Sequence, residues 1–253
     1  SSDRRGGRTR VNIILAEPGE IDAGGRLHLG GRRLRHLRDV LRAVPGDRLR
    51  VGEIGGQLGE GTLLSISAEH AAVDVTLESE APPPLPVHLV LALPRPKMLR
   101  RILRSVTELG VKQIYLINSF RVEKSYWQSP LLQENALRAN LREGLEQAVD
   151  TIAPELHLRN RFRPFVEDEL PDLCLGREAF LADPAATSAY PSDPRGACVL
   201  IIGPEGGFIP FERELLIASG ARPVHVGHRI LRVETAVQSC LGRHLPVGAT
   251  GAG

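Results

Sequence analysis

The sequence predicts an α/β protein in two parts: a small, strongly curved β-sheet or barrel, then a mostly parallel sheet covered by helices. Three observations carry this prediction. Short alternating apolar runs separated by Gly, Asp and Pro fill the first 80 residues. Four prolines crowd the segment from Pro82 to Pro86, which favours an extended chain. After them, strand and helix patterns alternate, as they do in parallel sheets.

These observations give the predicted domains: residues 1–80, a linker at 81–86, and residues 87–253. A chain of 253 residues exceeds the usual single domain of roughly 100 to 200 residues. It has no apolar run of about 18 residues, and the arginine-rich start from Ser1 to Arg10 leads into no apolar stretch. We therefore expect a soluble, cytoplasmic protein without a membrane partner.

The cysteines are few and far apart. Cys174, Cys198 and Cys240 form no Cys-x-x-Cys pair, and their number is odd. Neither a disulfide framework nor a zinc site fits this pattern. We expect reduced, buried thiols and no metal.

In the first part, strands are predicted at residues 11–15, 48–53, 61–67 and 72–77. One helix is predicted at 32–43, because Leu34, Leu37, Leu41 and their apolar neighbours recur at spacings of three and four. The stretch 26–50 holds eight arginines against two aspartates. Such a basic stretch suits phosphate contacts, for which Arg33, Arg35 and Arg38 are the candidates; an ordinary solvated charged face is the alternative.

In the second part, the first strand and helix are predicted at residues 87–93 and 98–109, with Gly110 closing the helix in a left-handed turn. A continuous apolar run predicts a buried strand, and apolar residues at helical spacing predict an amphipathic helix. The same patterns predict further strands at 111–117, 155–158, 179–182, 198–202 and 223–226, and further helices at 137–148, 210–218 and 234–244.

Two glycine-containing stretches at strand ends are the best candidates for a binding site. They are residues 200–208 and 226–236, and each carries one carboxylate, Glu205 or Glu234. Neither stretch matches a phosphate-binding motif, and an acid disfavours a phosphate ligand. Backbone groups beside glycine can approach a purine edge, and a carboxylate can accept ribose hydroxyls or face a sulfonium. Tight turns without any ligand are the alternative.

Four segments together resemble the ribosomal RNA (uracil-N3)-methyltransferase family, RsmE, of the SPOUT superfamily. The first two are the glycine stretches. The third is Ala92-Leu93-Pro94 together with Thr107 to Val111, and the fourth is His36 to Arg42 together with Pro45-Gly46-Asp47. The resemblance implies a PUA-like β-barrel at residues 1–80 that binds RNA. It also implies a methyltransferase domain at 87–253 with a trefoil knot, S-adenosylmethionine as cofactor, a homodimer, and 16S ribosomal RNA or the small ribosomal subunit as partner.

The resemblance also assigns the cofactor contacts, which would be made mostly by backbone groups. Leu181 ends the preceding strand and would complete the pocket. The other contacts are Ile202, Gly203, Pro204, Glu205, Gly206 and Gly207 in the first stretch, and Val226, Gly227, Ile230, Leu231, Arg232 and Ala236 in the second.

For catalysis, the acceptor would be N3 of uracil, whose proton must leave as the methyl group arrives. Arg232 would stabilise the developing uracil anion, and Glu205 or Glu234 would accept the proton. A carboxylate is a weak base for an imide, and a structural role for Glu234 at a helix start is equally consistent with the sequence.

The chain departs from the family pattern mainly on the side expected for the RNA. The departures are Val233, residues 148–154, residues 121–128 and Ile209. Arg121 and Lys124 would hold phosphates, and Tyr126 and Trp127 would stack on an extruded base, with burial of Trp127 in a dimer interface as the alternative. A related SPOUT methyltransferase acting at another RNA position, or a non-catalytic RNA-binding assembly factor, remain as alternative functions.

Overall fold

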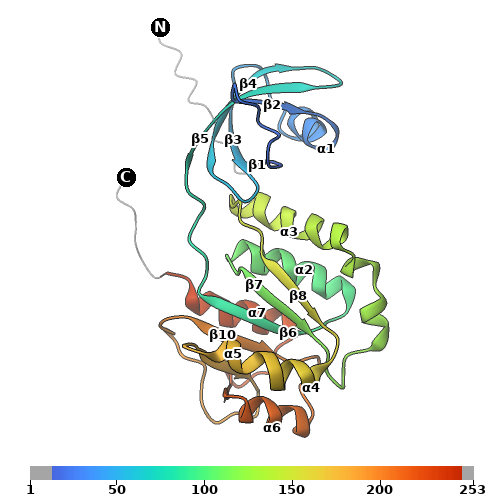
Figure 1. The fold of residues 1–253 in the computed structure, drawn as a ribbon, viewed down its shortest axis with the longest axis vertical. Coiled ribbons are helices and arrows are strands. Elements are labelled where there is room, and N and C mark those ends of the chain that lie inside the picture. Colours follow the sequence, from blue (N-terminus) through green and yellow to red (C-terminus); the bar gives the residue numbers. More distant parts are fainter. Residues whose placement is uncertain (1–12, 247–253) are drawn as a thin grey trace. The chain divides into compact units, whose positions relative to one another are not determined.

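The structure is a computed structural model that describes residues 13–246, so the arginine-rich segment from Ser1 to Arg10 lies outside the described residues. The chain divides into two compact units (Figure 1). Unit 1 comprises residues 1–82 and 145–153, and unit 2 comprises residues 83–144 and 154–253. Thus one segment from the middle of the chain, residues 145–153, belongs to the N-terminal unit.

Unit 1 is built on a five-stranded sheet with the order β1-β3-β4-β5-β2. Strands β1 and β3 are parallel, and the other neighbours are antiparallel. Gly59 and Gly61 in β4 have no room for a side chain, since a Cβ at Gly59 would lie 1.9 Å from a carbonyl of β5. The strands are β1 (Ile13–Ala16), β2 (Arg26–Leu29), β3 (Arg48–Glu53), β4 (Leu58–Ile66) and β5 (Ala71–Ser79).

The helix predicted at residues 32–43 is wrong in its length. Helix α1 (Gly31–Arg35) continues as a π-helical turn, η1 (His36–Val40), and the helix ends there. Leu34 and Leu37 are buried in the core of unit 1, as the spacing predicted. Arg42 then adopts a left-handed φ of 47°, a conformation that ends helices. Val44 lies beyond this end and is exposed, and Val40, the last residue of the π-helical turn, is exposed as well, so neither joins the apolar face of the helix.

Unit 2 contains a six-stranded, wholly parallel sheet with the order β11-β9-β10-β6-β7-β8. This confirms the predicted α/β class with a parallel sheet. Every residue of β10 is buried, which explains its continuous apolar sequence. The strands are β6 (Val87–Ala92), β7 (Gln113–Ile117), β8 (Glu155–Arg159), β9 (Glu178–Ala182), β10 (Cys198–Ile202) and β11 (Ala221–Val224).

The longer helices of unit 2 follow the predicted positions. They are α2 (Pro96–Glu108), α3 (Glu134–Ala148), α6 (Pro210–Ala218) and α7 (Val233–Leu241), with η5 (Gly242–His244) after the last; the C-terminal end of α3 falls in unit 1. Gly110 has a φ of +87°, which confirms the predicted left-handed turn after α2. Short helical segments join these elements: η2 (Lys124–Gln128), η3 (Pro130–Leu132), α4 (Phe162–Pro164), η4 (Phe165–Glu169) and α5 (Leu170–Cys174).

The three cysteines are free thiols. Cys198 and Cys240 are buried, whereas Cys174 is only half-buried. Burial raises the pKa of the Cys198 and Cys240 thiols to about 12, so both remain protonated at neutral pH. Within residues 13–246, no helix is both long and apolar enough to cross a membrane.

Candidate functional site

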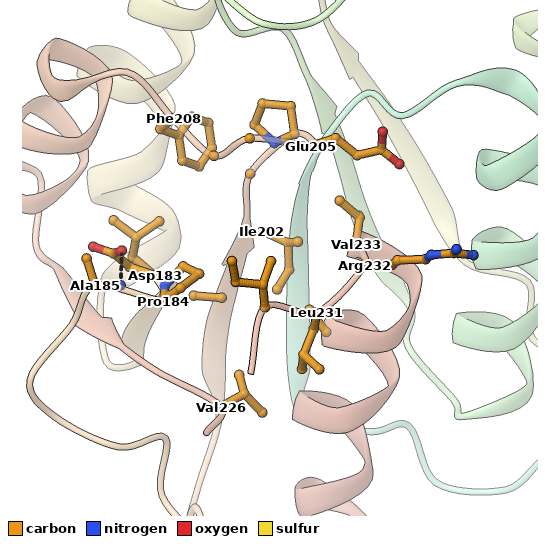
Figure 2. Close-up of a pocket in the computed structure, with 18 of the residues that line it drawn as sticks. Asp183, Pro184, Ala185, Ile202, Glu205, Phe208, Val226, Leu231, Arg232 and Val233 are labelled. Atoms are coloured by element: carbon orange, nitrogen blue, oxygen red, sulfur yellow. Dashed lines mark hydrogen bonds between the residues drawn. The ribbon is translucent and has the colours of Figure 1, made fainter. Parts of the chain in front are cut away.

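The candidate site lies where three parallel strands of unit 2 end side by side. In the sheet, Ala182 at the end of β9 is paired with Ile202 at the end of β10 and with Val224 at the end of β11. The loops that follow the three strands therefore start at one edge of the sheet. This edge is where α/β proteins usually bind ligands. A cavity of about 560 Å³ lies between these loops (Figure 2).

The structure brings together all the residues that the sequence assigned to the cofactor. The cavity is lined by Leu181, Ile202, Gly203, Pro204, Glu205, Gly206, Gly207, Val226, Gly227, Ile230, Leu231, Arg232 and Ala236. The two glycine stretches are thus neighbours in space, although 17 residues separate them along the chain. A single ligand in this cavity can contact both.

The cavity has a third wall that the sequence did not predict. This wall consists of Asp183, Pro184 and Ala185, directly after β9. Four further residues that were not predicted also line the cavity: Phe208, Arg213, Arg229 and Val233. Asp183 is largely buried and accepts hydrogen bonds from Arg213 Nε at 2.6 Å and from the Ala185 amide at 2.9 Å. An acid immediately after a buried strand was the available signal.

The first glycine loop has a backbone conformation that favours glycine at two successive positions. Gly206 and Gly207 have φ values of +86° and +74°. The Arg121 guanidinium donates to the carbonyl oxygens of both glycines, at 3.2 Å for Gly207. Arg121 was predicted to hold phosphates, and its observed partners are the backbone of this loop.

A buried carboxylate joins the same loop to the segment after β7. Glu212, which is only 4 % exposed, accepts a hydrogen bond from the Phe120 amide at 2.6 Å and from the Ile209 amide at 3.2 Å. Ile209 is the N-cap residue of α6 and has no polar side chain with which to cap the helix. Glu212 caps the helix start from within the helix, and it also fixes Phe120, next to Arg121.

The three predicted catalytic side chains have different surroundings. Glu205 and Arg232 line the cavity on the side opposite Asp183, and neither side chain has a hydrogen-bond or ion-pair partner within residues 13–246 (Figure 2). Glu234 does not line the cavity. It lies in the first turn of α7 and forms an ion pair with Arg101 of α2 at 3.1 Å. This geometry gives Glu234 a structural contact and leaves Glu205 and Arg232 free.

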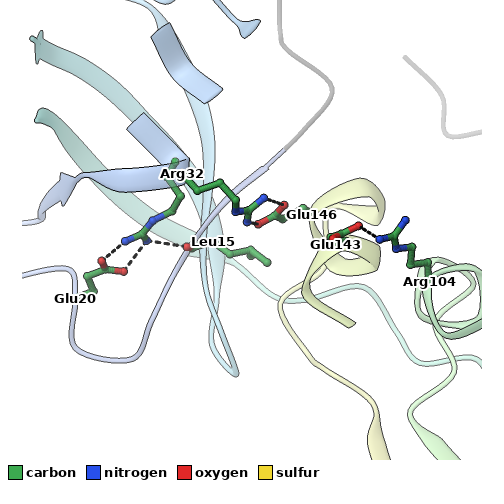
Figure 3. A network of polar contacts seen from close by, with 7 residues as sticks. Leu15, Glu20, Arg32, Arg104, Glu143 and Glu146 are labelled. Atoms are coloured by element: carbon green, nitrogen blue, oxygen red, sulfur yellow. Dashed lines mark hydrogen bonds and ion pairs between the residues drawn. The ribbon is translucent and has the colours of Figure 1, made fainter. Parts of the chain in front are cut away.

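In the basic stretch of unit 1, five of the eight arginines are paired with carboxylates. Arg33 is the most engaged: it donates to Glu20 in a two-pronged contact and to the Leu15 carbonyl at 3.0 Å, and both of these partners are labelled in Figure 3. The hydrogen bond to Glu20 raises the pKa of the Arg33 guanidinium. The other paired residues are Arg26, Arg32, Arg38 and Arg48.

Arg35, Arg42 and Arg50 have no such partner in the described part of the chain. Arg38 is exposed, and its polar partners within residues 13–246 are its neighbour Asp39 and the Ala68 carbonyl. Lys124 in unit 2 is also exposed and without a partner among the described residues. Of the cations predicted to bind RNA, Arg35, Arg38 and Lys124 are therefore exposed to solvent, while Arg33 is engaged inside unit 1.

Comparison with known proteins identifies close similarity over most of the chain. Residues 81–244 match the family model described as RNA methyltransferase domain. Ribosomal RNA small subunit methyltransferase E of Treponema pallidum is 35% identical over 238 residues, which cover 89% of this chain and 87% of that protein. The protein of the same name from Synechocystis is 32% identical, covering 81% and 67%.

Solved structures share the fold. A methyltransferase from Legionella pneumophila, in complex with bound S-adenosylmethionine, has a TM-score of 0.73 at 24% identity and covers 93% of this chain and 97% of its own. Ribosomal RNA small subunit methyltransferase E from Neisseria gonorrhoeae, bound to S-adenosyl methionine, has a TM-score of 0.73 at 20% identity, covering 92% and 96%. At these identities the likeness is one of fold.

Proposed function

Because the chain belongs to the ribosomal RNA small subunit methyltransferase E family, we propose that it transfers the methyl group of S-adenosylmethionine to N3 of a specific uridine in 16S ribosomal RNA. The observation that carries the proposal is the cavity at the ends of β9, β10 and β11, where both glycine stretches meet. The substrate of the protein would be the RNA or the small ribosomal subunit, and the protein would act in the cytoplasm.

The cavity fits S-adenosylmethionine by its chemistry. Leu181, Ile202, Val226 and Leu231 offer apolar surface for the adenine ring, and the glycines offer backbone groups for its edge. Asp183 and Glu205 place two carboxylates in the lining; of its three arginines, Arg213 is paired with Asp183, and Arg229 and Arg232 belong to the second glycine stretch. Acidic groups suit ribose hydroxyls, an ammonium group and a sulfonium better than they suit phosphate. When bound, the cofactor supplies a methyl group that its sulfonium has already activated.

For the acceptor, we assign Arg232 and Glu205 the working roles. When the N3 proton of uracil leaves, negative charge develops on O2 and O4 of the base, and the N–CH₃ bond would then form as the S–CH₃ bond breaks and a neutral thioether leaves. The unpaired Arg232 guanidinium can donate to these oxygens, and the unpaired Glu205 carboxylate can take the proton. Glu234, at the start of α7, is assigned a positioning role: its ion pair with Arg101 of α2 holds the start of α7 in place.

The remaining features of the family complete the proposal. We propose that residues 1–80 form a PUA-like RNA-binding barrel and that residues 87–253 form a SPOUT methyltransferase domain with a trefoil knot. A linker at residues 81–86 would join the two domains, and the protein would be a homodimer. The five-stranded sheet of unit 1 and the parallel sheet of unit 2 are compatible with these assignments.

Replacing arginines of unit 1 should separate RNA binding from stability. Arg35→Ala combined with Arg38→Ala is expected to weaken RNA binding. It should also reduce the slope of the logarithm of the binding constant against the logarithm of the salt concentration by about two, because each lost phosphate contact reduces that slope by about one. Arg33→Ala is expected to lower the free energy of unfolding by about 1–3 kcal/mol, because it removes the half-buried guanidinium that donates both to Glu20 and to the Leu15 carbonyl. Fluorescence polarisation at several salt concentrations and urea unfolding would measure the two effects. A salt slope unchanged in the double variant would count against this surface.

Two measurements test the proposed function. Isothermal titration calorimetry with S-adenosylmethionine should show binding, and its absence would favour a non-catalytic RNA-binding assembly factor. Nucleoside mass spectrometry of RNA from a deletion strain should show loss of N3-methyluridine at one small-subunit site. Loss of a different methylated nucleotide would identify a related SPOUT methyltransferase with another target. Unchanged methylation of every RNA would refute the proposal.

A further inference from the structure

A second cavity, of about 480 Å³, opens at the same edge of the unit 2 sheet. Trp127 and Gln128 of η2 and Gln133 after η3 line one side, and Leu158 and Asn160 at the end of β8 line the other. Because all six strands are parallel, the C-terminal ends of β7 and β8 lie at the same edge as those of β9 and β10. Both cavities therefore lie at one edge of unit 2, with β6 and β7 between β10 of the first cavity and β8 of the second.

The two sides of this cavity are held together by Asn118. Its side-chain oxygen accepts a hydrogen bond from Trp127 Nε1 at 3.1 Å, and its side-chain amide donates to the Asn160 carbonyl at 3.1 Å. The Asn118 backbone amide donates to the Arg159 carbonyl at 2.9 Å. The indole is thus fixed against the end of β8 before any ligand arrives, which lowers the entropic cost of binding.

The lining of the cavity is uncharged. None of its side chains carries a charge. The side-chain amides of Gln128, Gln133 and Asn160 make no hydrogen bond within residues 13–246. Leu158 is an exposed apolar side chain on the cavity wall, at 38% exposure. The one polar group of Trp127 is already satisfied by Asn118, so its ring offers only π and apolar surface.

These groups suit a flat, neutral ligand with hydrogen-bonding edges. An unpaired nucleobase has two π faces for stacking on an aromatic ring, and its edge matches the donors and acceptors of carboxamides. A phosphate would find no cation in the lining, and an aliphatic side chain would leave the three amides unused. The chemistry of the cavity therefore favours a base over the RNA backbone.

The segment that carries Trp127 also touches the candidate methyl-transfer site. Arg121 donates to the Gly206 and Gly207 carbonyls, and the exposed Lys124 lies between Arg121 and Trp127 in the sequence. Burial, and then the nearby carboxylates of Glu123 and Glu205, raise the pKa of the Tyr126 phenol. A strand of RNA at the first cavity would therefore have this segment beside it.

We propose that the Trp127 cavity binds a second, unpaired base of the RNA whose uridine is methylated, and so helps to select the target sequence. This inference rests on the proposed function, because it requires RNA at the neighbouring site. It assigns Trp127 a stacking role and gives the three carboxamides the role of reading the edge of the base.

The chain itself supplies the probe, because Trp127 is its only tryptophan. Intrinsic fluorescence of the full-length wild-type protein would be followed during titration with an unstructured RNA oligonucleotide. A second titration would use an abasic oligonucleotide with the same backbone, and fluorescence polarisation of a labelled strand would report binding independently. We expect the emission to be quenched by the intact RNA and to stay nearly constant with the abasic strand at saturation.

Variants then test the contribution to affinity. Trp127→Ala is expected to weaken binding of the intact RNA roughly 5- to 150-fold, the range of one lost base–aromatic stack, while Trp127→Phe retains most of the affinity. Binding of the abasic strand should be the same in both variants. Unchanged S-adenosylmethionine affinity, measured by calorimetry, would verify that each variant is folded.

Three outcomes would overturn the inference while leaving the proposed function intact. In the first, RNA binds without changing the emission of Trp127. In the second, the abasic strand quenches this emission as much as the intact RNA does. In the third, the emission changes when the protein alone is diluted. The last would indicate that a second copy of the chain covers the cavity. Absence of any RNA binding in the polarisation assay would instead argue against the proposed function itself.

Discussion

Gly207→Ala is expected to weaken binding of S-adenosylmethionine by about 5- to 30-fold, as measured by calorimetry. The φ of Gly207 is +74°, in the left-handed region, which costs a residue with a Cβ about 1–2 kcal/mol. Nothing lies within 4 Å of the position a Cβ would take, so the loss would come from the backbone alone. Because no side chain packs against this position, the loop of the variant can relax to another conformation. Part of the binding free energy is then needed to return the loop to the conformation that binds the cofactor.

The chain offers a matched control for this substitution. Gly176, in the turn between α5 and β9, has a φ of +70° and equally open surroundings, but it does not line the cavity. Gly176→Ala should therefore cost similar backbone strain and leave the dissociation constant unchanged. Combining Gly206→Ala with Gly207→Ala should raise the loss to about 30-fold or more, because two residues are strained. Wild-type affinity in the double variant would show that this loop conformation is not needed for the cofactor.

The core of the fold was predictable because local patterns determine it. The predicted limits of β3 and β10 agree with the structure, since Gly, Pro and Asp turns or a continuous apolar run mark their ends. Strand β2 was missed because it is short and its polar positions, Arg26 and His28, alternate with Leu27 and Leu29 within a stretch dominated by arginines. The helical segments from Phe162 to Cys174 were missed because prolines and π-helical geometry break the regular spacing.

The site was predictable only in part, because sequence gives loops but not their neighbours. Both glycine stretches carried a local signal, whereas Asp183 became part of the cavity only because β9 lies between β10 and β11 in the sheet. That strand order does not follow the order of the sequence. The same limit applies to Arg33: its charge suggested a phosphate contact, and only the fold reveals that Glu20 lies opposite it.

Glu212→Ala is expected to destabilise the protein by about 2–4 kcal/mol, because it removes a buried carboxylate that accepts from two backbone amides. Thermal unfolding should occur about 5 °C or more below that of the wild type. Glu212→Gln keeps one acceptor oxygen in place, so its loss should be about half as large. Glu214→Ala is the matched control, since Glu214 lies on the same helix, is exposed and has no partner in the described residues.

Loss of Glu212 should also reach the cofactor, although its side chain does not line the cavity. Glu212 fixes Ile209, at the end of the first glycine loop, and Phe120, beside the Arg121 that binds the carbonyls of Gly206 and Gly207. Releasing both contacts frees this loop, and the ligand must then order it on binding. We therefore expect the Glu212→Ala variant, measured well below its melting temperature, to bind S-adenosylmethionine more weakly than Glu214→Ala. Equal affinities would show that the carboxylate stabilises α6 without positioning the loop.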